Sequence, residues 1–182
     1  PAHDLLHCIR LHFPQHALLL DLARHSLAVV VVVGAQDRDL FGRRALALAL
    51  GAHHAVAPGA AANDLIKQLT HGLGADIVYE TSGVAATLEQ AVAMARRGGS
   101  VGLIGLCHGP STLRSTPVVL KELALIGSRG YNETTWQIMT ALLPRVVHDV
   151  LRLVTHEVAY ADFETALSLV ERREGSKIIL RP

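Results

Sequence analysis

One stretch, residues 74–106, constrains the fold of this chain more than any other, because it carries the pattern of a complete β-α-β unit. A short β-prone run is broken by the turn at residues 80–83 and followed by a segment with apolar residues at helical spacing. The glycine pair at 98 and 99 ends that segment, and an almost wholly apolar run follows, as expected for a strand buried on both faces. Such a unit predicts two parallel strands joined by a right-handed crossover helix. The strands are predicted at residues 77–79 and 101–106, and the helix at residues 85–97.

The rest of the chain repeats this alternation of strands and helices. Five consecutive valines before Gly34 form the clearest strand, while Asn63 and Pro144 are predicted to begin and to end helices. The alternation predicts an α/β fold, a Rossmann-type doubly wound parallel sheet of six strands with a short C-terminal helix-strand tail. Further strands are predicted at residues 5–11, 28–33, 55–57, 123–127, 154–158 and 177–180, and further helices at residues 17–25, 43–50, 63–70, 117–121, 133–143 and 162–172.

Composition limits what such a chain can bind. The net charge is +1 and the aromatic residues are one Trp, three Tyr and three Phe, which argues against a nucleic-acid partner. The longest apolar run, residues 27–33, is too short to cross a bilayer, so no membrane contact is expected. Two cysteines make no disulfide framework, which predicts a cytoplasmic location. The eleven histidines lack the spacing of metal ligands, so surface positions are favoured over a metal site.

Four blocks of sequence resemble the nucleotide-binding half of the zinc-type medium-chain dehydrogenases, most of all the branch with sorbitol and threonine dehydrogenases. They are ALALALGAHHAVAP, LTHGLGADIVYETSGVAATLEQAVAMARRGGSVGLIGL, VVLKELALIGSRGY and LVTHEVAYADFETALSLVERREGSKIILRP, in the family's order. The resemblance implies a nucleotide-binding domain at residues 1–150, and a tail at residues 151–182 that packs on a catalytic domain in the family.

The resemblance implies the nicotinamide-dinucleotide-binding part of an enzyme that oxidises an alcohol or polyol by hydride transfer. In the family, an amino-terminal domain supplies the catalytic zinc ligands, and this sequence starts after it, so no catalytic residue and no metal ligand is assigned here. Whether the chain acts as an enzyme is left open. The alternative is a non-catalytic cofactor-binding or dimerisation module.

The first turn of the expected sheet departs from the family. A Rossmann first turn reads GxGxxG because its backbone must approach the cofactor pyrophosphate closely. In this chain no glycine precedes Gly34, and Leu11, Phe13 and His16 would crowd the phosphates. The fold is therefore expected to survive with a damaged phosphate cradle, and the arrangement of residues 1–27 is left open.

The end of the second predicted strand bears on the choice of cofactor. Family members that bind NAD place an acidic residue there, whereas this chain has Gly34 followed by Ala35, Arg38 and Arg43. These residues would give room and positive charge to a 2′-phosphate, so NADP is favoured over NAD. The alternative is a solvated loop with ordinary surface arginines.

Three later turns follow strands whose carboxyl ends meet at one edge of a doubly wound sheet, where ligands bind. The resemblance implies that they contact the cofactor, the second on its nicotinamide side and the third near its carboxamide. A basic residue of the tail would reach the pyrophosphate. The alternatives are plain turns and a surface lysine. The predicted contacts are Thr81, Ser82 and Gly83; Ile104, Gly105 and Leu106; Gly127, Ser128 and Arg129; and Lys177.

The last strand of the predicted sheet is expected to form a homodimer. The segment from Leu123 to Ser128 contains no proline and no inward charge, which leaves a strand edge open to pairing. The family resemblance implies the same interface.

Overall fold

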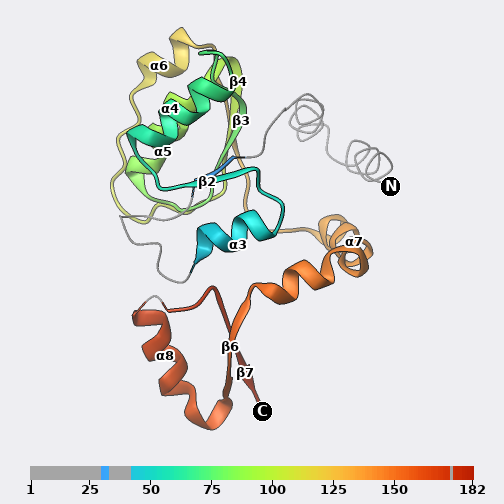
Figure 1. Cartoon of the computed structure of the whole chain (residues 1–182). Helices are drawn as coiled ribbons and strands as arrows, with labels where there is room; N and C mark the ends of the chain where they lie inside the picture. Colours follow the sequence, from blue (N-terminus) through green and yellow to red (C-terminus); the bar gives the residue numbers. More distant parts are fainter. Residues whose placement is uncertain (1–29, 33–41, 173) are drawn as a thin grey trace.

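A computed structural model describes residues 30–32, 42–172 and 174–182 of the chain. Within these residues, seven strands pair in parallel and form three sheets, and Figure 1 shows the pair β6 and β7 apart from the other strands. In chain order the elements are β1 (Val30–Val32), α3 (Arg43–Ala49), β2 (His54–Val56), α4 (Ala60–Leu69), β3 (Ala75–Glu80), α5 (Ala85–Met94), β4 (Ala95–Leu103), α6 (Ser115–Leu120), β5 (Ala124–Gly127), α7 (Glu133–Arg152), β6 (Val154–Ala159), η1 (Tyr160–Asp162), α8 (Phe163–Glu171) and β7 (Lys177–Arg181).

The central sheet has the strand order β3-β4-β5, with helix α5 on one face. Val78, Val101 and Leu125 are register partners across the three strands, and parallel partners point to the same face. On that face Ala91 and Ala95 pack against the fully buried Val101. Ala91 lies on α5 and Ala95 begins β4, and their small side chains allow the helix to approach the sheet closely.

The α/β class with parallel strands is confirmed. The single six-stranded sheet stays a prediction, because β1 and β2 form a sheet of their own beside the three-stranded one. In the doubly wound strand order 3-2-1-4-5-6, the first strand lies between these two groups. That strand, predicted at residues 5–11, and the helix predicted at residues 17–25 lie outside the described residues.

Helix α5 ends at Met94, three residues earlier than predicted, and β4 begins directly at Ala95. Lys121 explains this early end, because its ammonium donates to the carbonyl oxygens of Val92, Ala93 and Ala95, each at 2.9 Å. Helix carbonyls at a carboxyl end lack partners within the helix, and a lysine there satisfies them and complements the helix dipole. The residue that ends this helix therefore lies far along the chain.

Two helix boundaries predicted from single residues were wrong. Pro144 lies inside α7, which continues to Arg152; an exposed helix loses one hydrogen bond at a proline and can continue with a bend. Helix α4 begins after Gly59 rather than at Asn63. The Asn63 amide oxygen instead accepts a hydrogen bond from Gln90 of α5 at 3.3 Å.

The C-terminal part forms a separate unit in which β6 and β7 pair and α8 packs through Ala166 and Leu169. Arg43 of α3 reaches it and donates to the Gly175 carbonyl at 3.2 Å. The division of the chain at residue 150 stays a prediction, and α7 runs across that point.

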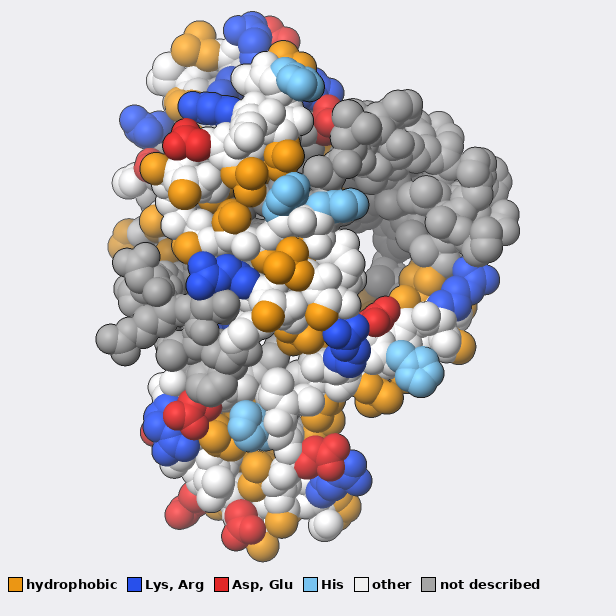
Figure 2. All heavy atoms as spheres, in the orientation of Figure 1, with side chains coloured by type: hydrophobic (Ala, Val, Ile, Leu, Met, Phe, Trp, Pro, Cys, Tyr) orange, Lys and Arg blue, Asp and Glu red, His pale blue; other side chains and the backbone are white. Residues whose placement is uncertain are grey.

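The surface carries charges of both signs. On the face drawn in Figure 2, basic and acidic side chains lie interspersed rather than gathered into one basic region. None of the described helices is long and apolar enough to cross a membrane.

Candidate functional site

The carboxyl ends of three parallel strands meet at one edge of the central sheet. Strand β3 ends at Glu80, β4 at Leu103 and β5 at Gly127, and each is followed by a turn. The amides of Ile104 and Gly105 donate to the Glu80 carbonyl at 2.8 and 3.0 Å, so the turn after β4 is hydrogen-bonded to the end of β3. The structure thus brings two of the three predicted turns into contact.

The third turn joins the same edge through the backbone. The Ser128 amide donates to the Leu103 carbonyl at 2.9 Å. Gly127 is exposed, and a Cβ at this position would meet nothing within 4 Å. Its bare backbone therefore leaves open space beside the strand end, as close approach by a ligand requires. Arg129 is exposed and lies two residues further along.

Glu80 is buried beneath the first turn, with only 6% of its surface exposed. Its Oε1 accepts from the Ser82 amide at 2.9 Å and from the Ser82 hydroxyl at 2.5 Å. The Gly83 amide lies 3.1 and 3.2 Å from the two carboxylate oxygens, and the Thr87 hydroxyl donates to Oε1 at 2.9 Å. Burial raises the pKa of Glu80, but the hydrogen bonds from Ser82, Thr87 and Gly83 outweigh burial and hold that pKa below its ordinary value. Glu80 therefore carries a fixed negative charge at neutral pH.

Two glycines allow the first and second turns to touch. Gly83 has φ 68°, and a Cβ there would overlap the Leu106 carbonyl. A Cβ on Gly105 would overlap the Gly83 amide and come within 2.6 Å of Glu80 Oε2. No side chain of any size fits between these turns, so both glycines are required by packing at the site.

The remaining predicted site residues lie elsewhere or outside the described residues. Arg43 contacts the C-terminal unit through Gly175. Lys177 begins β7, and its side chain is exposed. Gly34, Ala35 and Arg38 fall outside the residues that the structure describes.

Sequence reasoning missed Glu80 and Thr87 as residues of this site. Glutamate at a strand end is ordinarily exposed, and a threonine in the first turn of a helix is unremarkable by itself. The available signal was the spacing, since Glu80, Ser82 and Thr87 place a carboxylate and two hydroxyls around one turn. A carboxylate followed within seven residues by several donors can fold its own turn around itself.

A zinc ion does not fit the described residues. Among them, no three His, Cys, Asp or Glu side chains are grouped so that they could hold a metal. Cys107 follows the second turn and is exposed as a free thiol.

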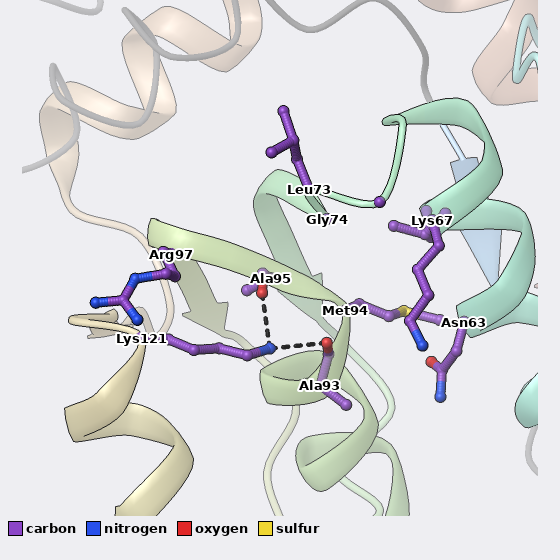
Figure 3. Close-up of a pocket in the computed structure, with 11 residues that line it drawn as sticks. Asn63, Lys67, Leu73, Gly74, Ala93, Met94, Ala95, Arg97 and Lys121 are labelled. Atoms are coloured by element: carbon purple, nitrogen blue, oxygen red, sulfur yellow. Dashed lines mark hydrogen bonds between the residues drawn. The ribbon is translucent and has the colours of Figure 1, made fainter.

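A cavity of about 260 Å³ lies at the opposite end of the sheet (Figure 3). It opens beside Gly74 and Ala95, near the amino ends of β3 and β4, with Lys67 and Asn63 on one side and Lys121 on the other. Burial and then the nearby charge of Lys67 lower the pKa of the Lys121 ammonium. Because that ammonium is occupied by the carbonyls that end α5, the cavity belongs to the helix terminus rather than to the strand-end site.

The comparison with family models identifies the chain. The model described as "Zinc-binding dehydrogenase" matches residues 17–145, well over half of the sequence. The chain belongs to the zinc-binding dehydrogenase family. The strand-end site of this family member lies inside the matched region, which covers β1 to β5 and most of α7.

Curated relatives of this zinc-binding dehydrogenase chain include polyol and amino-acid dehydrogenases. Sorbitol dehydrogenase of Halalkalibacterium halodurans is 29% identical over 120 residues, which cover 65% of this chain and 35% of that protein. L-threonine 3-dehydrogenase of Bacillus velezensis is 34% identical over 121 residues, with the same shares of 65% and 35%. The chain thus matches about a third of the length of these relatives.

The fold agrees with solved dehydrogenase structures. An alcohol dehydrogenase from Thermotoga maritima superposes with a TM-score of 0.77 at 24% identity, over 91% of this chain and 46% of that one. This likeness supports the dehydrogenase fold.

Proposed function

We propose that this chain is the nicotinamide-dinucleotide-binding part of a zinc-type dehydrogenase that oxidises an alcohol or polyol. The observation that carries the proposal is the strand-end site, where three turns that contain Ser82, Gly105 and Gly127 meet at the carboxyl edge of a parallel sheet. In open α/β sheets this edge is where nucleotides bind. The chain would bind and orient the dinucleotide, which supplies the hydride acceptor when bound.

The proposed cofactor contacts fall into four groups. The first turn would lie close to the cofactor, the second would contact its nicotinamide side, and the third would lie near its carboxamide. A 2′-phosphate would lie near the arginines that follow the second strand, and a tail lysine would reach the pyrophosphate. The residues are Thr81, Ser82, Gly83, Ile104, Gly105, Leu106, Gly127, Ser128, Arg129, Gly34, Ala35, Arg38, Arg43 and Lys177.

The proposal divides the work between two parts of the enzyme. Residues 1–150 would bind the dinucleotide, and residues 151–182 would form a tail that packs on a catalytic domain. The described residues contain no group of side chains that could hold zinc. In the proposed enzyme, zinc would therefore be bound by the region that the relatives have and this chain does not match.

A non-catalytic role as a cofactor-binding or dimerisation module is the second candidate. The sequence before Gly34 favours it, because a glycine-free first turn would hold the pyrophosphate poorly. In the described sheet β5 pairs on one side with β4, and its other edge is proposed as the homodimer contact.

A calorimetric titration of the chain with NADH and with NADPH tests the proposal. We expect weak binding and a preference for NADPH. Each lost hydrogen bond to the pyrophosphate removes about 1.5–3 kcal/mol, and about 1.4 kcal/mol is a factor of ten in affinity. Two such losses would move a micromolar site toward the millimolar range.

Two variants that each remove one arginine distinguish a specific contact with the 2′-phosphate from a general effect of lost positive charge. Arg43→Gln should weaken NADPH binding and leave NADH binding unchanged, whereas Arg145→Gln, on the exposed surface of α7, should change neither. Equal affinities for the two cofactors in the unmodified chain would remove the arginines from the proposal. Submicromolar binding of either cofactor would contradict the expected loss at the first turn.

A further inference from the structure

Glu80 is a buried charged residue that the proposed cofactor contacts do not use. We propose that Glu80 is a positioning residue, which holds the turns at residues 81–83 and 104–106 at the spacing that the nicotinamide end of the dinucleotide requires. This inference rests on the proposed function and adds a residue that does not itself touch the cofactor.

The side chain of Glu80 holds the first turn from the inside. Its carboxylate accepts the amide hydrogens of two consecutive residues, Ser82 at 2.9 Å and Gly83 at 3.1 Å, together with the Ser82 hydroxyl at 2.5 Å. Two backbone amides directed at one carboxylate fix the path of the chain between them. The Ser82 hydroxyl also donates to the carboxylate, which leaves its own lone pairs to accept from the Val84 amide at 3.3 Å.

The main chain of the same residue holds the second turn. The Glu80 carbonyl accepts from the amides of Ile104 at 2.8 Å and Gly105 at 3.0 Å. The carboxylate that binds the first turn and the carbonyl that binds the second turn belong to the same residue at the end of β3. Glu80 therefore fixes the position of both turns relative to β3.

Thr87 links this arrangement to helix α5. Its hydroxyl lies 2.9 Å from Glu80 Oε1 and 2.7 Å from the Ser82 hydroxyl. The carboxylate is therefore held between the turn and the first residues of a helix that packs on the sheet. A carboxylate is an acceptor only, whereas the amide of glutamine has a donor end that would face the Gly83 amide or the two hydroxyls.

The proposed role of Glu80 depends on the negative charge of its carboxylate, whereas a residue that only fills space would depend on size. Replacement by glutamine keeps the size of the side chain and removes the ionised acceptor, so it alters the turn without creating a cavity. The adenosine end of the dinucleotide would bind at the end of the second predicted strand, near Gly34 and the residues that follow it, and not at Glu80. The effect of Glu80→Gln should therefore appear in NADH binding and be absent from ADP-ribose binding.

The test is a fluorescence and calorimetric titration of the full 182-residue chain and its variants with NADH and with ADP-ribose. Glu80→Gln should raise the dissociation constant for NADH about tenfold or more and change that for ADP-ribose less than about twofold. Glu80→Asp, which restores the charge, should recover part of the loss.

Thr87→Val removes one donor and should weaken NADH binding by about two- to fivefold. Glu89→Gln on the same helix, where Glu89 lies 3.6 Å from Arg114, is the matched control and should have no effect.

The variants test the role of Glu80, whereas the unmodified chain tests the proposed function. Unchanged NADH binding in both Glu80→Gln and Thr87→Val would remove the positioning role. Equal weakening of NADH and ADP-ribose would show that Glu80 supports only the general fold, and would also overturn it. Failure of the unmodified chain to bind either ligand would contradict the proposed function itself.

Discussion

Gly105 is the residue on which contact between the first two turns depends most directly. A methyl group at this position would overlap the Gly83 amide and press on the Glu80 carboxylate. Backbone atoms cannot move aside as a flexible side chain can, so the turns must separate. The glycine is thus required by its neighbours, and its own φ is not in the left-handed region.

We predict that Gly105→Ala lowers the free energy of unfolding by about 1–3 kcal/mol, the usual cost of overpacking at a tight site. Urea denaturation followed by circular dichroism measures this change. Gly109→Ala is the matched control, because a Cβ at Gly109 meets nothing within 4 Å. Equal stability of the two variants would show that the turns can separate without cost.

At the scale of secondary-structure elements, β5 is an edge strand of the three-stranded sheet β3-β4-β5. Its residues carry no charge, and among the described strands it pairs with β4 alone. Leu125 points toward the cluster of Ala91, Ala95 and Val101, so a charge there would damage the monomer as well as any interface. Ile126 is the register partner of Gly102 on the other face and is the better position for a test.

If β5 pairs edge to edge with a second copy, Ile126→Lys should shift the chain from dimer to monomer, because like charges would face each other across the two-fold axis. Sedimentation velocity measures the change, and Ile126→Val, which keeps the strand apolar, is the control. A monomeric unmodified chain, or a variant with unchanged mass, would count against this interface.

Helix α5 shows how an element can be terminated from a distance. The three carbonyls that accept from Lys121 belong to the last turn of the helix and the first residue of β4. The amide of Gly98 also donates to the Lys121 carbonyl at 2.7 Å. The side chain and the backbone of one lysine therefore fix the passage from helix to strand.

At the scale of the whole molecule, the chain matches about a third of the length of its relatives sorbitol dehydrogenase and L-threonine 3-dehydrogenase. We predict that the purified 182-residue chain, supplied with zinc, NAD⁺ or NADP⁺ and sorbitol or threonine, forms no reduced cofactor. The physical reason is that zinc needs three protein ligands at a catalytic site, and the described residues provide no such group. Absorbance of the reduced nicotinamide measures turnover, and an intact sorbitol dehydrogenase is the positive control. Turnover that a chelator abolishes would contradict the prediction.

The sequence alone determined the class of fold, the alternation of strands and helices among the described residues, and the family. Strand and helix periodicities are local properties, so the strand-helix-strand order from Ala75 to Leu103 could be predicted. The second strand nevertheless begins at Ala95, six residues before its predicted start, and contains the glycine pair that was expected to end the helix. The site turns could be predicted for the same reason, because the carboxyl ends of parallel strands share one edge of a sheet.

Only the tertiary structure decided where helices end and which residues hold the turns together. Helix α5 ends at Met94 because Lys121, distant in sequence, donates to the carbonyls of Val92, Ala93 and Ala95. Helix α7 continues past Pro144 although local propensity predicts a stop. The spacing of Glu80, Ser82 and Thr87 marks a turn, but only the folded structure shows that the Glu80 carboxylate is buried there, with the donors of Ser82, Gly83 and Thr87 in place of water. Local sequence sets the type of each element, whereas its ends and its buried charges depend on partners that folding brings together.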